Sequence, residues 1–371
     1  MKKILAMLLA LCMIFALAAC GETAPAETKP AEEPAAAPEE PAEETAPEAP
    51  AEEAPAEEIP AEAAYKLGLG VSLNMDSSKT GNAQVDATTA AVILDEQGKI
   101  VAVKIDVAQN KMDITDGAVD TEKEFLTKAE LGDDYNMVKF SDATLEWYQQ
   151  AAAFEQFVLG MTGAEVEAME TVVNEEGHEV TTDETLYASC SISIGDFKEA
   201  VVKACNDEQA ATFAGAGGFS LGLAIISKSD ESTAATAEED GVVKMYSEYA
   251  AVVVDGDGVI LAAVTDATQP QIKINAAGEI VEATFKGTKR ELKEDYNMVK
   301  FSDATLEWYE QAKNFTDYAT GKTAEDLRAT ETKTNDEGHN VFVDETLYAS
   351  VSISIDGMIN VIAKAADNAL A

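Results

Sequence analysis

Positive charge is scarce in this chain. Its 371 residues include 26 lysines and arginines against 69 aspartates and glutamates, which gives a formal net charge of −43 at pH 7. A field of that size repels the phosphates of nucleic acid and the anionic headgroups of lipids. The composition therefore excludes a nucleic-acid-binding role.

Histidine and the motifs of common catalytic sites are also scarce. His178 and His339 are the two histidines, and each follows a Glu-Gly dipeptide typical of an exposed turn. One histidine in each half of the chain is too few for a zinc site unless carboxylates converge from elsewhere. The sequence has no HExxH, CxxC or phosphate-binding glycine loop. We therefore predict no catalytic residues and no metal site, and we favour a binding protein over an enzyme.

Cysteine occurs four times, and two of these residues lie in the folded part of the chain. Cys190 and Cys205 occur in the first half only, and Val351 and Ala366 stand at the equivalent positions of the second half. Apolar replacements at both positions favour buried thiols. A disulfide remains the alternative, because an exported compartment allows one.

The N-terminus has the features of an export signal followed by a stalk. Residues 1–19 begin with two lysines and continue as an apolar run, which predicts a signal peptide. Leu-Ala-Ala-Cys at 17–20 resembles the bacterial lipobox, and this resemblance implies a lipid on Cys20 and an extracytoplasmic, membrane-anchored protein at the cell surface. Residues 20–64 are rich in Pro, Ala and Glu, so we predict a disordered linker there.

The rest of the chain is a duplication. The fifteen residues 134–148 return letter for letter at 295–309, an offset of 295 − 134 = 161. We predict a first repeat at 65–206, an Ala/Gly linker at 207–218 and a second repeat at 219–371. Strand-like alternation followed by helical periodicity predicts an α+β fold for each repeat, an antiparallel sheet with helices packed on one face.

Local patterns predict the elements of the first repeat. Residues 83–94 and 99–107 read as a hairpin, residues 188–194 as a strand, and residues 196–205 as a closing helix. A longer helix is expected to begin at Ser141 or Asp142 and to run to Gly160.

The duplicated stretch also supplies the candidate ligand-binding residues. It gathers aromatic side chains in a chain that has few of them, and aromatic rings give large contact areas at low entropic cost. Trp147 and Tyr148 fit the apolar stripe of a helix, so we interpret them as core anchors. The ligand-binding candidates are Tyr135, Asn136 and Lys139 in the first repeat and Tyr296, Asn297 and Lys300 in the second.

Two family resemblances complete the reading. The Asp-x-x-Gly hairpins at 95–100 and 255–260, with a small-residue segment at 188–193 before a terminal helix, look like the exported FMN-binding domain family. That resemblance implies a flavin held through Ser191 and Ser352, although Ser189 and Cys190 replace the glycine and alanine of the family motif. The pattern K-x-E-L-x-x-D-Y-N-M with W-Y-x-Q-A also resembles uncharacterised lipoproteins of gut Firmicutes.

These observations predict a surface lipoprotein that presents two homologous domains to an extracellular small molecule or protein, with no cofactor. Tandem copies raise the effective concentration for a repeated ligand, which suits capture at a surface. One alternative is an extracytoplasmic electron carrier with an FMN in each domain. Another is a structural spacer stiffened by calcium.

Overall fold

The computed structural model of the protein describes residues 63–215 and 218–371. The predicted signal peptide, the predicted lipidation site Cys20 and the predicted linker up to residue 62 lie outside the described residues. Residues 63 and 64, expected at the end of the linker, open the first strand instead.

The first repeat builds a four-stranded antiparallel sheet in the order β3-β2-β1-β6. Leu67 and Leu69 alternate along β1 with Gly68 and Gly70, so at this point one face of the strand is apolar and the other carries no side chain. The strands of this repeat are β1 (Ala63–Asn74), β2 (Asn82–Leu94), β3 (Ile100–Asp113), β4 (Thr171–Val173), β5 (Glu179–Thr181) and β6 (Ala211–Gly215).

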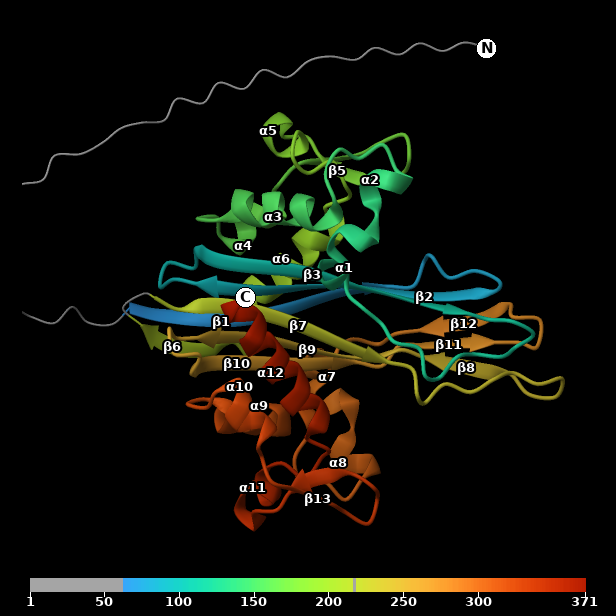
Figure 1. Cartoon of the computed structure of the whole chain (residues 1–371), viewed down its shortest axis with the longest axis vertical. Coiled ribbons are helices and arrows are strands. Elements are labelled where there is room, and N and C mark those ends of the chain that lie inside the picture. Colours follow the sequence, from blue (N-terminus) through green and yellow to red (C-terminus); the bar gives the residue numbers. More distant parts are fainter. Residues whose placement is uncertain (1–62, 216–217) are drawn as a thin grey trace, which may run out of the picture. The chain divides into compact units, whose positions relative to one another are not determined.

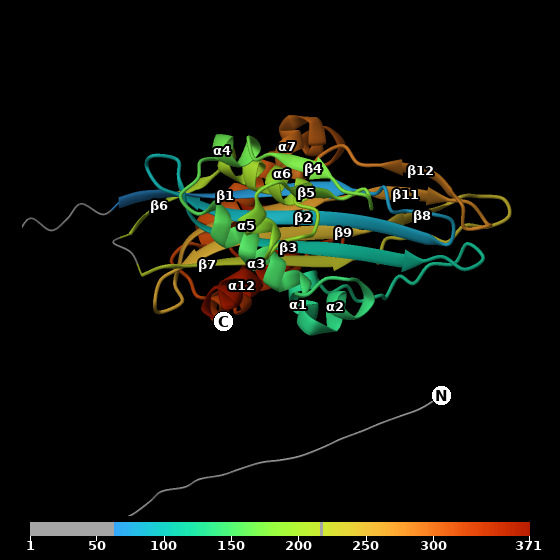
Figure 2. The same cartoon turned by 90° about the horizontal axis from the view of Figure 1, so that it is seen from above.

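The second repeat builds a three-stranded sheet, β10-β9-β7, and a smaller one, β12-β11-β8. The smaller sheet packs against the far ends of β2 and β3 through Val243, Ile272 and Ile274, as Figure 2 also shows. The strands of the second repeat are β7 (Ser220–Lys228), β8 (Gly241–Lys244), β9 (Tyr246–Val254), β10 (Ile260–Thr268), β11 (Gln271–Ile274), β12 (Ile280–Thr284), β13 (Thr332–Thr334) and β14 (Asn340–Phe342).

The helices follow the same order in both repeats. The first repeat has α1 (Lys128–Leu131), η1 (Gly132–Tyr135), α2 (Met137–Phe140), α3 (Trp147–Val158), α4 (Gly163–Glu167), α5 (Glu184–Tyr187) and α6 (Gly195–Cys205). The second has α7 (Lys289–Leu292), η2 (Lys293–Tyr296), α8 (Met298–Phe301), α9 (Trp308–Ala319), α10 (Ala324–Arg328), α11 (Glu345–Ser350) and α12 (Asp356–Leu370).

The two sheets pack face to face between two layers of helices. In Figure 1 α3, α4 and α6 cover the outer face of the first sheet, and α9, α10 and α12 cover that of the second. The inner faces share one apolar core that joins Leu67 and Ile93 to Leu223 and Val253. The predicted α+β class, antiparallel sheets with helices on one face, is confirmed. Because the inner core belongs to both repeats, they form one compact unit.

Matched contacts relate the two repeats across this interface. The ammonium of Lys203 on α6 pairs with Glu291 of the second repeat at 3.1 Å, and Lys364 on α12 pairs with Glu130 of the first at 2.5 Å. Both lysines also donate to a carbonyl of their own sheet at 2.9 Å. Since the partners are offset by 364 − 203 = 161 and 291 − 130 = 161, the interface has approximate twofold symmetry.

Three predictions of local structure need correction. The expected linker at 207–218 contains β6, which pairs with β1 and extends the first sheet. The strand expected at 188–194 is absent, because the Asp183 carboxylate caps a short helix through the N–H groups of Thr185 and Leu186 and the chain then loops into α6. The long helix begins at Trp147 and ends at Val158, because Glu146 acts as its N-cap.

Candidate functional site

The duplicated stretch folds into a short helical arm in front of a long helix. The carboxylate of Glu146 caps α3 and also accepts hydrogen bonds from the backbone N–H groups of Met137 and Val138, at 2.7 and 3.3 Å. Ahead of the arm, Thr127 and Glu130 form a capping box on α1. This box fixes the backbone of the turn that carries Lys128.

Lys128 stands in a cleft of ≈ 310 Å³ in the first repeat, which we call the lysine cleft. Its ammonium lies 5.1 Å from the centre of the Tyr135 ring and 5.4 Å from that of Trp147, distances typical of cation–π contact. The cleft is lined by Asn74, Ser77, Asp86, Thr88, Val107, Gln109, Lys128, Met137, Trp147, His178, Ile192, Ser193, Asp196 and Phe197. It therefore combines one cation, two carboxylates and an apolar wall.

The charged groups of the cleft are only partly matched to one another. Within residues 63–215 and 218–371, no carboxylate oxygen lies within 4.0 Å of the Lys128 ammonium. Burial lowers the pKa of Lys128, while the charges of Asp86 and Asp196 oppose that shift. Burial also raises the pKa of Asp196. Asp86 accepts a hydrogen bond from Gln84 through Oδ2 at 2.6 Å, whereas its Oδ1 is buried and has no partner in the described residues.

The second repeat builds the same lysine site and adds a third ring to it. Lys289 and Tyr296 also line a hollow of ≈ 370 Å³, whose lining does not include Trp308. Lys289 lies 4.9 Å from the Tyr296 ring centre and 5.1 Å from that of Trp308, as its counterpart does with two rings. A third ring, that of Tyr246, adds a contact at 5.0 Å. Burial lowers the pKa of Lys289 to about 8, and it holds the pKa of Tyr246 well above its ordinary value. We call these four residues the lysine cage.

Of the candidates predicted from the sequence, the two tyrosines reach these sites. Tyr135 and Tyr296 lie beneath the lysines, and their hydroxyls donate to Gln109 and Gln269 at 3.5 and 3.1 Å. Trp147 is 2% exposed and contacts Phe197 edge to face, so its predicted place in the core is confirmed, and it lines the cleft as well.

The other candidates lie on the surface of the helical arm. Asn136 and Asn297 adopt left-handed backbone conformations, with φ of 57° and 60°, and join η1 to α2 and η2 to α8. Lys139 and Lys300 lie over the exposed rings of Phe140 and Phe301.

Tyr148 is 38% exposed, so the prediction that it anchors the core is wrong. Its hydroxyl donates to Asp133 at 3.2 Å, because the start of α3 at Trp147 turns this side chain toward η1.

The two serines proposed for flavin attachment link helices to loops. Ser191 donates to the side-chain oxygen of Gln150 on α3 through its N–H at 2.9 Å and its hydroxyl at 3.3 Å. Ser352 makes the same two bonds to Gln311, at 2.8 and 3.3 Å. These bonds hold the segment after α5 against α3 and the segment after α11 against α9.

Histidine and cysteine take no part in a recognisable metal site. Within the described ranges, no group of three His, Cys, Asp or Glu side chains is placed to hold a metal. His178 lines the cleft, and its Nδ1 lies 3.6 Å from Glu176. Cys190 and Cys205 are free, which confirms the predicted thiols, and burial raises their pKa values to about 12 and about 11.

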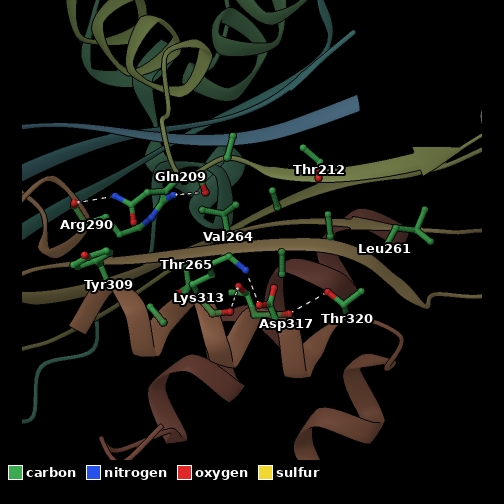
Figure 3. A pocket seen from close by; sticks show the side chains of 16 residues that line it. Gln209, Thr212, Leu261, Val264, Thr265, Arg290, Tyr309, Lys313, Asp317 and Thr320 are labelled. Atoms are coloured by element: carbon green, nitrogen blue, oxygen red, sulfur yellow. Dashed lines mark hydrogen bonds and ion pairs between the residues drawn. The ribbon is translucent and has the colours of Figure 1, made fainter. Parts of the chain in front are cut away.

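A second hollow, of ≈ 340 Å³, lies where β6, β10 and α9 meet (Figure 3). Its charged side chains are already paired. Lys313 contacts Asp317 at 2.6 Å, and the Arg290 guanidinium bonds the Asp207 carboxylate at 3.0 and 3.1 Å and the Gln209 carbonyl at 2.9 Å. This hollow therefore offers less to a polar ligand than the lysine cleft does.

Sequence reasoning missed Lys128 and Lys289 as site residues. Both belong to the repeated K-x-E-L pattern, in which the threonine before and the glutamate after form the capping box. The signal was therefore present, but one lysine among 26 basic residues does not stand out until the fold buries it among rings.

Comparisons with known proteins give one partial similarity. A protein described as chlorophenol reductase from Desulfitobacterium hafniense is 32% identical over 124 residues, which are 28% of this chain and 38% of that protein. The chain thus matches well under half of the relative's length. No protein-family model matches the chain, and no solved structure does. Among the described helices, none is both long enough and apolar enough to cross a membrane.

Proposed function

We propose that this protein is a surface lipoprotein that binds a small molecule in the lysine cleft of its first repeat. The observation that carries the proposal is Lys128, a largely buried ammonium above two aromatic rings, with no carboxylate within 4.0 Å in the described part of the chain. Clefts that hold small molecules combine an apolar wall with a few fixed polar groups, and this cleft has both. The second repeat supports the fold through the shared inner core.

The attachment to the membrane rests on the lipobox at residues 17–20. A diacylglyceryl group on Cys20 gives durable anchoring, because two acyl chains bind a bilayer far better than one. Expression of the full chain in a bacterial host with labelled fatty acid should give a labelled protein in the membrane fraction, and Cys20→Ser should abolish the label. A labelled Cys20→Ser protein would refute this anchor.

Binding is tested on the full chain with tryptophan fluorescence and calorimetry. The probes are a phenol, a chlorophenol, benzoate, an aromatic amine, an amino acid and FMN. A compound that binds in the lysine cleft should lose about tenfold in affinity in Lys128→Met, since cation–π and polar contacts of this kind contribute on the order of 1–2 kcal/mol. The matched control is Lys289→Met, which alters the filled cage and should leave the affinity unchanged. Equal losses in both variants would count against the cleft.

An FMN-binding electron carrier is the second candidate. The observation in its favour is that the partial relative carries the name of a reductase. In that case, purified protein should be yellow or should take up FMN with a stoichiometry of two, and Ser191→Ala and Ser352→Ala should each remove one flavin. A protein that stays colourless after incubation with FMN and dialysis would eliminate this candidate.

A further inference from the structure

The second repeat shows which chemical group fits beside the lysine. The β2–β3 register pairs Ala87 with Ala108 and Asp86 with Gln109, and the β9–β10 register pairs Ser247 with Thr268. The offset between these hairpins is 247 − 87 = 160, so Tyr246 and Gln269 are the counterparts of Asp86 and Gln109. Gln109 accepts the hydroxyl of Tyr135, and Gln269 accepts that of Tyr296. The backbone of Tyr246 therefore occupies the place that Asp86 occupies in the first repeat.

From that place the Tyr246 side chain enters the lysine cage. Its ring centre lies 5.0 Å from the Lys289 ammonium and 5.4 Å from that of Lys228. Its hydroxyl donates to Glu248 at 3.4 Å, and Glu248 stands at the position of Thr88, a residue that lines the lysine cleft. A neutral phenol thus lies against the ammonium with its hydroxyl on a carboxylate.

The first repeat has the same lysine without the third ring. Asp86 is too short to cover Lys128, and the space in front of it is the open lysine cleft. The position of Glu248 is taken in the first repeat by Thr88, which lines the cleft. The hydroxyl of a threonine can accept a hydrogen bond, so a ligand that supplies an O–H gains a partner there.

We propose that the ligand of the lysine cleft is a single-ring phenol, bound as the Tyr246 ring is in the second repeat, with its ring against Lys128 and Trp147 and with its hydroxyl directed to Thr88. The proposal rests on the function proposed above, to which it adds the class of ligand. Tyr246 is then an internal copy of the ligand in the second repeat, so of the two equivalent ring positions in the described residues only the one beside Lys128 is free. Residue 86 and its counterpart, residue 246, decide whether each site is open.

The test uses para-cresol, which is the free side chain of tyrosine, with toluene as the matched compound that lacks the hydroxyl. Calorimetry on the full chain should show one para-cresol bound per chain, with toluene several-fold weaker because it lacks the hydroxyl that Thr88 can accept. Asp86→Tyr, which installs the residue of the second repeat, should abolish binding. Tyr246→Asp, which opens the cage, should raise the stoichiometry from one to two. Circular dichroism checks that each variant is folded.

The outcomes separate this inference from the proposed function. Toluene binding as tightly as para-cresol, para-cresol binding unchanged in folded Asp86→Tyr, or two sites in the natural chain would each overturn the phenol inference. If para-cresol fails to bind while another probe binds in a Lys128-dependent way, the inference falls and the proposed function stands. If no probe binds, both fall. If Asp86→Tyr does not fold, the stoichiometry of Tyr246→Asp and the toluene comparison decide.

Discussion

The interface between the repeats contains one buried ion pair that breaks its twofold symmetry. The side chains of Arg290 and Asp207 are each 8% exposed, and the guanidinium makes two hydrogen bonds to the carboxylate, at 3.0 and 3.1 Å. Asp207 also accepts the N–H of Leu69 at 3.2 Å. The symmetry-related positions hold Ala129 and Asn368, a neutral pair. The same position of the interface is therefore occupied by a charged pair on one side and by a neutral pair on the other.

Arg290→Ala should lower the free energy of unfolding by about 3–5 kcal/mol, because it leaves the Asp207 carboxylate buried without its partner. The double variant Arg290→Ala/Asp207→Asn copies the neutral pair from the other side of the interface. It should recover most of the loss, since no unpaired charge remains. Urea unfolding followed by tryptophan fluorescence measures both values.

The double variant also serves as the control for lost packing, since both variants lack the arginine side chain. A loss below about 1 kcal/mol in Arg290→Ala would mean that water reaches Asp207 and that the pair is worth no more than a surface ion pair. A double variant that is no more stable than the single one would show that lost packing, and not the unpaired charge, sets the cost.

Three further predictions concern packing, pH and thiol reactivity. Gly222→Ala should destabilise the protein by about 3 kcal/mol in urea unfolding, because a Cβ there would overlap the backbone of α12, whereas Gly256→Ala, which meets no atom within 4 Å, should be close to neutral. Burial raises the pKa of Glu155 to about 7, so the folded state binds this proton more tightly than the unfolded state does. The free energy of unfolding should therefore fall as the pH rises from about 4.5 to 7. Glu155→Gln should reduce that fall by as much as about 3 kcal/mol, as measured by urea unfolding at several pH values. Cys190 and Cys205 should react with iodoacetamide at pH 8 at least about tenfold more slowly in the folded than in the unfolded protein, as read by mass spectrometry, because burial raises both pKa values.

Each of these predictions has a distinct contrary result. Equal stability of the two glycine variants would show that α12 moves away at little cost. A pH profile that is the same for Glu155→Gln and the natural protein would place this carboxyl in contact with water. Rapid labelling of folded Cys190 would mean that the segment between α5 and α6 opens readily.

The elements that the sequence predicted correctly are those set by local chemistry. The β2–β3 hairpin and the helix α6 each depend on residues a few positions apart. The incorrect predictions of secondary structure concern segments whose conformation depends on contacts with residues far away in the sequence. Nothing in the composition of residues 211–215 distinguishes a linker from a strand, because what makes them a strand is the edge of β1, which lies far away in sequence.

The sequence by itself determined the duplication, the acidic charge and the α+β class, because repeats, counts and short periodicities need no tertiary contacts to be read. The tertiary structure alone decided that the two repeats share one inner core and that the lysine of each K-x-E-L pattern lies among aromatic rings. It alone showed that Tyr246 fills one of two equivalent sites while Asp86 leaves the other open. Residues 86 and 246 lie on strands, and the lysines that they approach follow about forty residues later in short helices. Contact between them depends on how strand and helix pack, so it exists only in the folded chain.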